Sequence, residues 1–255
     1  MAQDQRATPH CRKLVRVMEH VFRDIEGGMT PPVPVRLRDG YVVRFPNRDI
    51  NHALLLKLAA MLQFLNSSII LCEAGLVLAQ GAVQRMAEEA SDDALFLSLG
   101  IIHGVRKIHV DYLERFWADA EDDPSDIESV TKPSQIPRNK ILAEIHREWS
   151  DPSTADKLAK RISKTYSGYV HAAAANVMDI YDPQTGQFGV SGAAAYRQMD
   201  HDYDLWNVFY RCALTLITAL KALGSQAHVD ALGSILMKFQ VESGRDGGYR
   251  GERQQ

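Results

Sequence analysis

The longest regular pattern in the sequence is a row of apolar residues that recurs every three or four positions between residues 82 and 118. Its members are Val83, Ala87, Ala90, Ala94, Leu97, Ile101, Val105, Ile108 and Tyr112. This spacing matches the period of an α-helix and predicts one long helix with a single apolar face. Gly100 or Gly104 is expected to divide it. Other elements must cover such a face in water, which favours a bundle of helices.

The same helical spacing recurs along most of the chain. It predicts further helices over residues 11–26, 53 to about 78, 138–149, 154–181, 193–223 and 226–241. Asp49 or Asn51 is expected to cap the second helix. Strands and helices do not alternate, so we expect an all-α fold, a helical bundle of six to eight helices.

Two short segments interrupt the helical pattern and predict one or two small β-hairpins. Asp39-Gly40 lies between two β-type runs, which favours a tight hairpin near residues 33–45. Turn residues in YDPQTGQFGVSG favour a second hairpin or an ordered loop.

The domain organisation follows from length and composition. A chain of 255 residues, 45% hydrophobic and 24% charged, fits one globular domain. We expect a disordered N-terminus over residues 1–9, a single helical domain over 10–241 and a disordered tail over 242–255. The acidic, proline-containing segment 119–137 is predicted to be an exposed loop.

Several features favour a cytoplasmic location. The three cysteines, Cys11, Cys72 and Cys212, form no CxxC pair, so they are expected to be reduced and buried. The first residues lack the pattern of a signal peptide. Polar residues interrupt the apolar stretch from Ala53 to Val83, so no membrane span is expected. The net charge of -3 indicates no class of partner.

The sequence lacks the short motifs that carry well-known chemistries. It contains no P-loop, dinucleotide fingerprint, HExxH, GxSxG or EF-hand sequence. The histidines show no metal-ligand spacing, and the acidic residues around His201 are expected to serve a helix N-terminus. We therefore predict neither a metal nor a cofactor, and the catalytic residues, if any, are unassigned.

Arg85 and Glu89 form the first candidate site. They lie four residues apart, so they can pair on one helix face, opposite the apolar row. Two interpretations stay open. The face is either solvated, as charged helix faces usually are, or part of a groove where Arg85 meets an anion and Glu89 orients it.

The second candidate site lies in KLAKRISKTYSGYVH. Lys160, Lys164, Ser167 and His171 share one helix face, while Tyr166 belongs to the opposite, core-facing row. Basic side chains beside an imidazole can contact phosphate or move a proton. A lysine-rich solvated face explains the same pattern.

These two segments carry a resemblance. Arg85-x-x-x-Glu89, Asp93-Ala-Leu-Phe96-Leu97 and Tyr166-Ser167-Gly168-Tyr169-Val170-His171 together resemble a group of uncharacterised bacterial helical proteins, distantly similar to HEPN-like bundles. The resemblance covers roughly residues 50 to 200 and implies that the two segments pack around a shared polar pocket. HEPN-like proteins that cleave RNA place four to six residues between an arginine and a histidine. Here Arg197 and His201 have three between them, so the nuclease motif is not carried over.

Two functions are consistent with these observations. The first is a helical interaction or scaffold protein, expected to form a homodimer, without a catalytic motif. The alternative is a HEPN-like protein that binds a nucleotide or an RNA phosphate, as a nuclease of a bacterial defence or toxin system would. In that case Arg85 and His171 would contact the anion, Glu89 and Tyr166 would position them, and Lys160 and Lys164 would add positive charge.

Overall fold

The computed structural model describes residues 6–37, 40–119, 135–148 and 151–245. The part of the chain that the structure describes is 74% helical, and its two sheets are small antiparallel pairs, so the predicted all-α bundle with small hairpins is confirmed. The described α-helices are α1 (Thr8–Gly27), α2 (Ile50–Glu73), α3 (Val77–His103), α4 (Lys107–Asp119), α5 (Arg138–Ile145), α6 (Pro152–Val170), α7 (Ala174–Val177), α8 (Ala195–Ala222) and α9 (Gln226–Glu242).

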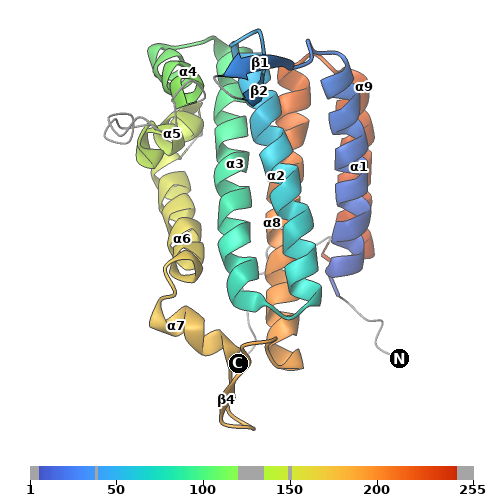
Figure 1. The fold of residues 1–255 in the computed structure, drawn as a ribbon. Coiled ribbons are helices and arrows are strands. Elements are labelled where there is room, and N and C mark those ends of the chain that lie inside the picture. The colour runs from blue at the N-terminus through green and yellow to red at the C-terminus, as the bar shows by residue number, and fades with distance from the viewer. Residues whose placement is uncertain (1–5, 38–39, 120–134, 149–150, 246–255) are drawn as a thin grey trace.

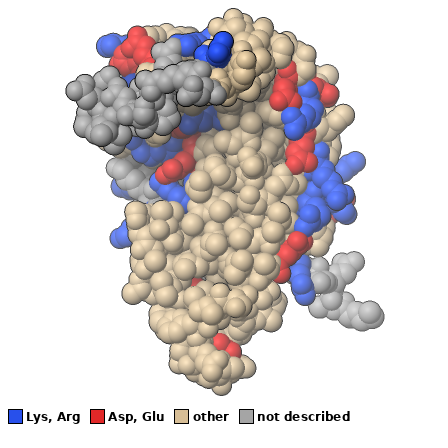
Figure 2. All heavy atoms as spheres, in the orientation of Figure 1, with Lys and Arg blue, Asp and Glu red and all other residues tan. Residues whose placement is uncertain are grey.

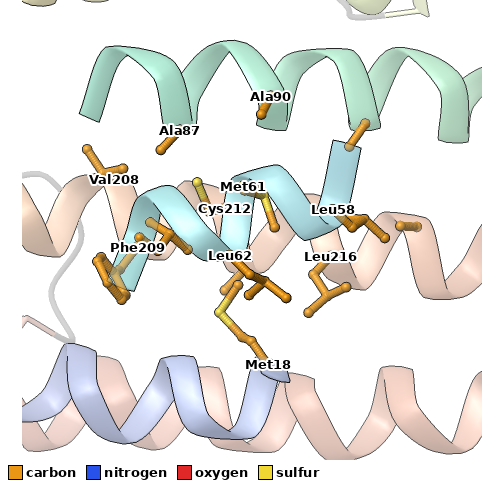
Figure 3. Close-up of a cluster of buried hydrophobic side chains, with 14 of the residues drawn as sticks. Met18, Leu58, Met61, Leu62, Ala87, Ala90, Val208, Phe209, Cys212 and Leu216 are labelled. Carbon is orange, nitrogen blue, oxygen red and sulfur yellow. The ribbon is translucent and has the colours of Figure 1, made fainter. Parts of the chain in front are cut away.

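Five long helices, α1, α2, α3, α8 and α9, form the body of the bundle, and α4 to α7 lie along the outer side of α3 (Figure 1). The core lies where α2 passes between α1 and α3 and rests on α8. Figure 3 shows Met18 of α1, Met61 of α2, Ala87 of α3 and Phe209 of α8 meeting there. All four side chains are completely removed from solvent.

The first helix begins at Thr8, three residues before the expected start. The main-chain N–H of Thr8 donates to Asp202 of α8 at 2.9 Å, and the Thr8 hydroxyl donates to the same carboxylate. Since the first N–H groups of a helix need acceptors, this carboxylate allows α1 to start here. Asp202 therefore serves the N-terminus of a helix that is distant in sequence.

Local signals place the ends of α2. The Asp49 side chain accepts from the N–H of His52 at 2.9 Å, which makes it the predicted cap. The helix ends at Glu73, not near residue 78, because Gly75 adopts a φ of 69° and turns the chain into α3.

Gly104 divides the long helical pattern into α3 and α4. Its φ is 100°, a conformation that favours glycine. Gly100 remains helical and serves packing, because a Cβ there would lie 2.6 Å from the His109 ring. That ring is buried and stacks on Phe96, with 4.3 Å between ring centroids.

The predicted helix over 154–181 is interrupted after Val170. Ala172 has a φ of 49°, and the chain resumes as the short α7 and a 3-10 turn, Met178–Ile180. This interruption explains why the structure has nine α-helices in its described residues where six to eight were expected.

Both predicted hairpins are present. Strands β1 (Val33–Leu37) and β2 (Gly40–Arg44) pair antiparallel, as do β3 (Tyr181–Asp182) and β4 (Gln187–Phe188). The turn residue Asp39, most of the predicted loop over 119–137, most of the N-terminus over 1–9 and most of the tail over 242–255 lie outside the described residues.

The structure tests two further expectations, that the three cysteines are buried and that no helix spans a membrane. Cys11, Cys72 and Cys212 are buried and free, as predicted. By length and composition α2 could cross a bilayer, but the core helix of a soluble protein meets the same criteria, and 44% of its most apolar stretch is buried.

Candidate functional site

A cleft of about 430 Å³ lies where α2, α3, α4 and α5 meet. We call it the α2–α5 cleft. Its walls combine aromatic and aliphatic side chains with five charged groups. The charged residues are Lys57, Glu89, Asp93, Arg115 and Arg138, and the principal apolar ones are Phe64, Met86, Tyr112, Phe116, Ile136 and Ile141.

Asp93 is the polar centre of this cleft. One carboxylate oxygen accepts from Lys57 Nζ at 2.7 Å and from the Tyr112 hydroxyl at 3.0 Å, and the other accepts from Arg138 at 2.6 Å. These donors come from α2, α4 and α5, while Asp93 belongs to α3. One nearly buried carboxylate therefore joins four helices.

Arg138 also pairs with the neighbouring Asp92. Burial raises the pKa of Asp92 to about 6, although the Arg138 guanidinium lowers it. Burial by itself would lower the pKa of Arg138, but Asp92 and Asp93 raise it above its ordinary value. Arg138 is therefore a fixed cation, whereas Asp92 titrates close to neutral pH.

Aromatic rings hold Lys57 in place. Its Nζ lies 5.1 Å from the centre of the Phe116 ring and 5.9 Å from that of Tyr112. A cation over ring faces is attracted by their negative charge, so the ammonium is stabilised by the rings as well as by Asp93.

The predicted Arg85 and Glu89 pair forms, with 2.6 Å between Arg85 Nη2 and Glu89 Oε1. Glu89 lines the α2–α5 cleft and is 45% exposed, whereas the Arg85 side chain is only 16% exposed. Arg85 is thus neither fully solvated nor free for an anion, because Glu89 already neutralises it.

The second predicted cluster divides between the interior and the surface. Tyr166 is buried beside Arg211 and Glu88, which form an ion pair with 2.9 Å between Arg211 Nε and Glu88 Oε1. Burial raises the pKa of this tyrosine well above its ordinary value. Lys164 and His171 are exposed, and the side chain of Lys160 lies outside the described residues.

The predicted residues do not converge on one pocket among the described side chains. Arg85 and Glu89 bond to each other, and neither shares a hydrogen bond or ion pair with Tyr166 or His171. The two segments do pack together, since the Tyr169 ring fills the space beside Gly81 of α3.

A second cluster of polar side chains lies next to the C-terminal end of α6. The Tyr169 hydroxyl donates to Asp179 at 2.6 Å, and His201 Nε2 lies 3.8 Å from the same carboxylate. Burial lowers the pKa of His201, which keeps the ring neutral, and raises that of Asp204 nearby. Within the described ranges, no group of three or more His, Cys, Asp or Glu side chains could hold a metal ion.

A second hollow of about 760 Å³ lies between α1 and α2. Four of its polar side chains satisfy one another: Arg23 pairs with Glu26, and the Asn66 amide donates to Glu19 at 2.6 Å. Although it is larger, it offers fewer aromatic walls than the α2–α5 cleft.

One surface of the molecule lacks charge. Between Lys57 and Arg85, Glu73 is the only charged residue, and the outward sides of α2 and α3 in this stretch lie next to each other. Figure 2 shows the result as an uncharged surface down the middle of the view. We call it the α2–α3 face, and it comprises the exposed or half-buried Phe64, Ser67, Leu71, Ala79, Ala82, Val83 and Met86.

Comparisons with known proteins name no relative. No family model, curated protein or solved structure matches the chain.

Sequence reasoning missed Lys57, Tyr112, Arg115 and Arg138 as members of a site. Lys57 could have indicated this site from the sequence. A lysine inside an otherwise apolar helix must find a counter-charge, which indicates a carboxylate nearby in the fold.

Proposed function

We propose that this protein is an interaction protein that associates with a second copy of itself through the α2–α3 face. The observation that carries the proposal is the lack of charge on a surface that the fold leaves uncovered. Ala79 and Met86 on this face are exposed, and the face as a whole has no charged side chain. Such a surface gains free energy when a partner removes it from water.

A second copy fits this face for reasons of symmetry. In a two-fold dimer each residue of a face meets the same face of the partner, so any net charge would repel itself. The α2–α3 face avoids that repulsion. Its alanines, Ala79 and Ala82, leave room for a second pair of helices to approach closely.

The size of the surface fits a modest dimer. The face spans residues 64–71 of α2 and 79–86 of α3, about 12 Å of each helix, and two neighbouring helices are about 20 Å wide, which gives a footprint of roughly 240 Å². Figure 2 shows the uncharged surface continuing towards the end of α6 and α7. Val170, at the end of α6, and Met178, directly after α7, are exposed. A standard interface covers about 800 Å² on each partner, so we expect association at micromolar concentrations.

Sedimentation of wild type and Ala79→Glu over a range of concentrations tests this proposal. Ala79 is exposed, so a glutamate should leave the monomer folded but place two carboxylates in the dimer interface. We expect the dissociation constant to rise by about a hundredfold or more. Met237→Glu is the matched control, because Met237 is 68% exposed on α9, away from this face.

Two results would reject the dimer. Wild type could remain monomeric at the highest concentration, or Ala79→Glu could dimerise as well as Met237→Glu. Flotation with lipid vesicles tests whether a membrane covers the face instead. If wild type is monomeric and binds vesicles, and Ala79→Glu abolishes that binding, the partner of the face is a lipid bilayer and not a second copy.

A specific observation favours a second function, the binding of a nucleotide or RNA phosphate. Lys157, Arg161 and Lys164 are exposed and lie on one side of α6, with His171 exposed at its end. This basic row supports phosphate contact, and the HEPN-like relationship is part of the same proposal. A cytoplasmic location, which the free cysteines support, is part of the same proposal.

Fluorescence anisotropy with a short labelled RNA tests this second function. We expect the affinity for RNA to fall as the salt concentration rises. We also expect it to fall by about tenfold in Arg161→Gln/Lys164→Gln, because each phosphate contact that is lost releases fewer counterions on binding. Arg85→Ala in the same assay tests whether Arg85 contributes. Equal binding by the double variant and by wild type would exclude the basic row of α6 as the contact.

A further inference from the structure

Among the described residues, the α2–α5 cleft contains one cation that no carboxylate neutralises. Asp93 pairs with Lys57 and Arg138, and Glu89 pairs with Arg85. Arg115 also lines the cleft, and among the described residues its guanidinium donates only to the main-chain oxygen of Gln135, at 3.3 Å. Because a guanidinium has five N–H donors, most of those of Arg115 are available to a ligand.

A second donor lies in the same wall. The Nε of Arg138 is buried and has no hydrogen-bond partner in the described part of the chain. Arg138 and Arg115 both line the cleft, from α5 and α4. Because this nitrogen is shielded from solvent, a ligand in the cleft does not reach it, and Arg115 remains the donor for an acceptor with negative charge.

The remaining walls suit a flat ring. Tyr112 and Phe116 lie nearly parallel, 6.0 Å apart and at 11°, and Phe64 and Met86 line the same cleft from α2 and α3. Aromatic rings stack on one another, and methionine packs well against them. The volume of about 430 Å³ falls in the range of cavities that hold small molecules.

The position of Lys57 decides between an anionic and a cationic ligand. Lys57 already occupies the position over Tyr112 and Phe116 that a cationic ligand would take. A ligand cation would therefore meet Lys57 and Arg115, whereas an anion would meet unsatisfied donors.

We propose that the α2–α5 cleft binds a small molecule made of a flat aromatic ring and one anionic group. The ring lies against Phe64 and Met86, beside the edge of Phe116, and the anion accepts from Arg115. This site does not require the proposed dimer, but Phe64 and Met86 belong to both surfaces, so we expect ligand binding and dimer formation to compete.

Isothermal titration calorimetry with two pairs of probes tests the proposal. Indole-3-acetate is compared with neutral indole-3-acetamide, and adenosine monophosphate with adenosine. These pairs separate a carboxylate from a phosphate as the anionic group. We expect at least one anion to bind at least about tenfold more tightly than its neutral analogue, since hydrogen bonds to charged groups are the stronger ones.

Two variants and two controls locate the binding. Arg115→Gln should lose the preference for the anion, and Ala60→Phe should block the cleft from α2 while it keeps every charge. Lys107→Gln is the matched control, because it removes a cation that is 88% exposed on the same helix as Arg115. Ala79→Glu, which we expect to remain monomeric, should bind the probe at least as tightly as wild type does, which separates this site from the dimer.

The proposal fails if neither anion binds at millimolar concentration, or if the neutral analogues bind equally well. It also fails if folded Arg115→Gln and folded Ala60→Phe both bind like wild type. Circular dichroism and thermal melting establish that each variant is folded. Should Arg115→Gln prove unfolded, the result for Ala60→Phe decides.

Discussion

Replacing Asp93 with asparagine should destabilise the protein far more than the same change at the surface. Asp93 accepts from Lys57, Arg138 and Tyr112 and is nearly buried. Breaking a buried ion pair by removing one partner costs about 3 to 5 kcal/mol. Lys57 and Arg138 retain 20% and 25% exposure, and Arg138 keeps Asp92, so solvent offsets part of that cost. We expect Asp93→Asn to lose about 2 to 3 kcal/mol of unfolding free energy.

Urea denaturation followed by circular dichroism at neutral pH measures this loss. Asp111→Asn is the control, because Asp111 pairs with Lys107 on the surface of α4 at 2.8 Å, where both side chains are exposed. Such a pair contributes about 0 to 0.5 kcal/mol. Adding Lys57→Met to Asp93→Asn should recover part of the loss, since it removes a cation left without its carboxylate. Equal losses for Asp93→Asn and Asp111→Asn would refute the view that Asp93 holds four helices together.

The remaining predictions concern the packing of α3 and the titration of Asp92. Gly100→Ala should destabilise the protein by about 1 to 3 kcal/mol, because the new Cβ meets the His109 ring. Gly233→Ala, in a helix position with nothing within 4 Å, should instead stabilise it by about 0.5 to 1 kcal/mol, and thermal melting compares the two. Asp92 has a pKa of about 6 in the folded state, above its unfolded value, so the stability it contributes is present below about pH 4 and is lost as pH rises through 6. The stability of Asp92→Asn relative to wild type should therefore increase between pH 4 and 6 in urea denaturation, and a constant difference across that range would contradict the raised pKa.

Local signals in the sequence predict most of the elements of this fold. The Asp49 cap, the hairpin around Gly40 and the break at Gly104 each depend on residues within one turn of the feature. The start of α1 could not be predicted in this way, because its acceptor, Asp202, lies 194 residues away from Thr8. The interruption at Ala172 is of the same kind, since no glycine or proline marks it.

The candidate site was harder to predict than the elements. The Arg85 and Glu89 pair was predictable because its two members share one helix. The Asp93 network was not, because its donors come from three other helices and no spacing in the sequence relates them. Helical periodicity indicates which face of a helix is buried, but not which helix covers it.

The polar residues of α3 show what that limit means. Gln80, Gln84, Glu88 and Ser91 follow one another at intervals of three or four residues and are all buried. Three of them bond to α8: Gln80 to the main-chain oxygen of His201, Glu88 to Arg211 and Ser91 to Thr215. Because a shift of either helix by one turn would leave these groups unpaired in the interior, the row fixes the register of α3 against α8. Apolar packing alone would tolerate such a shift more easily, so the polar row determines how α3 lies in the bundle, and with it where the α2–α5 cleft and the α2–α3 face are formed.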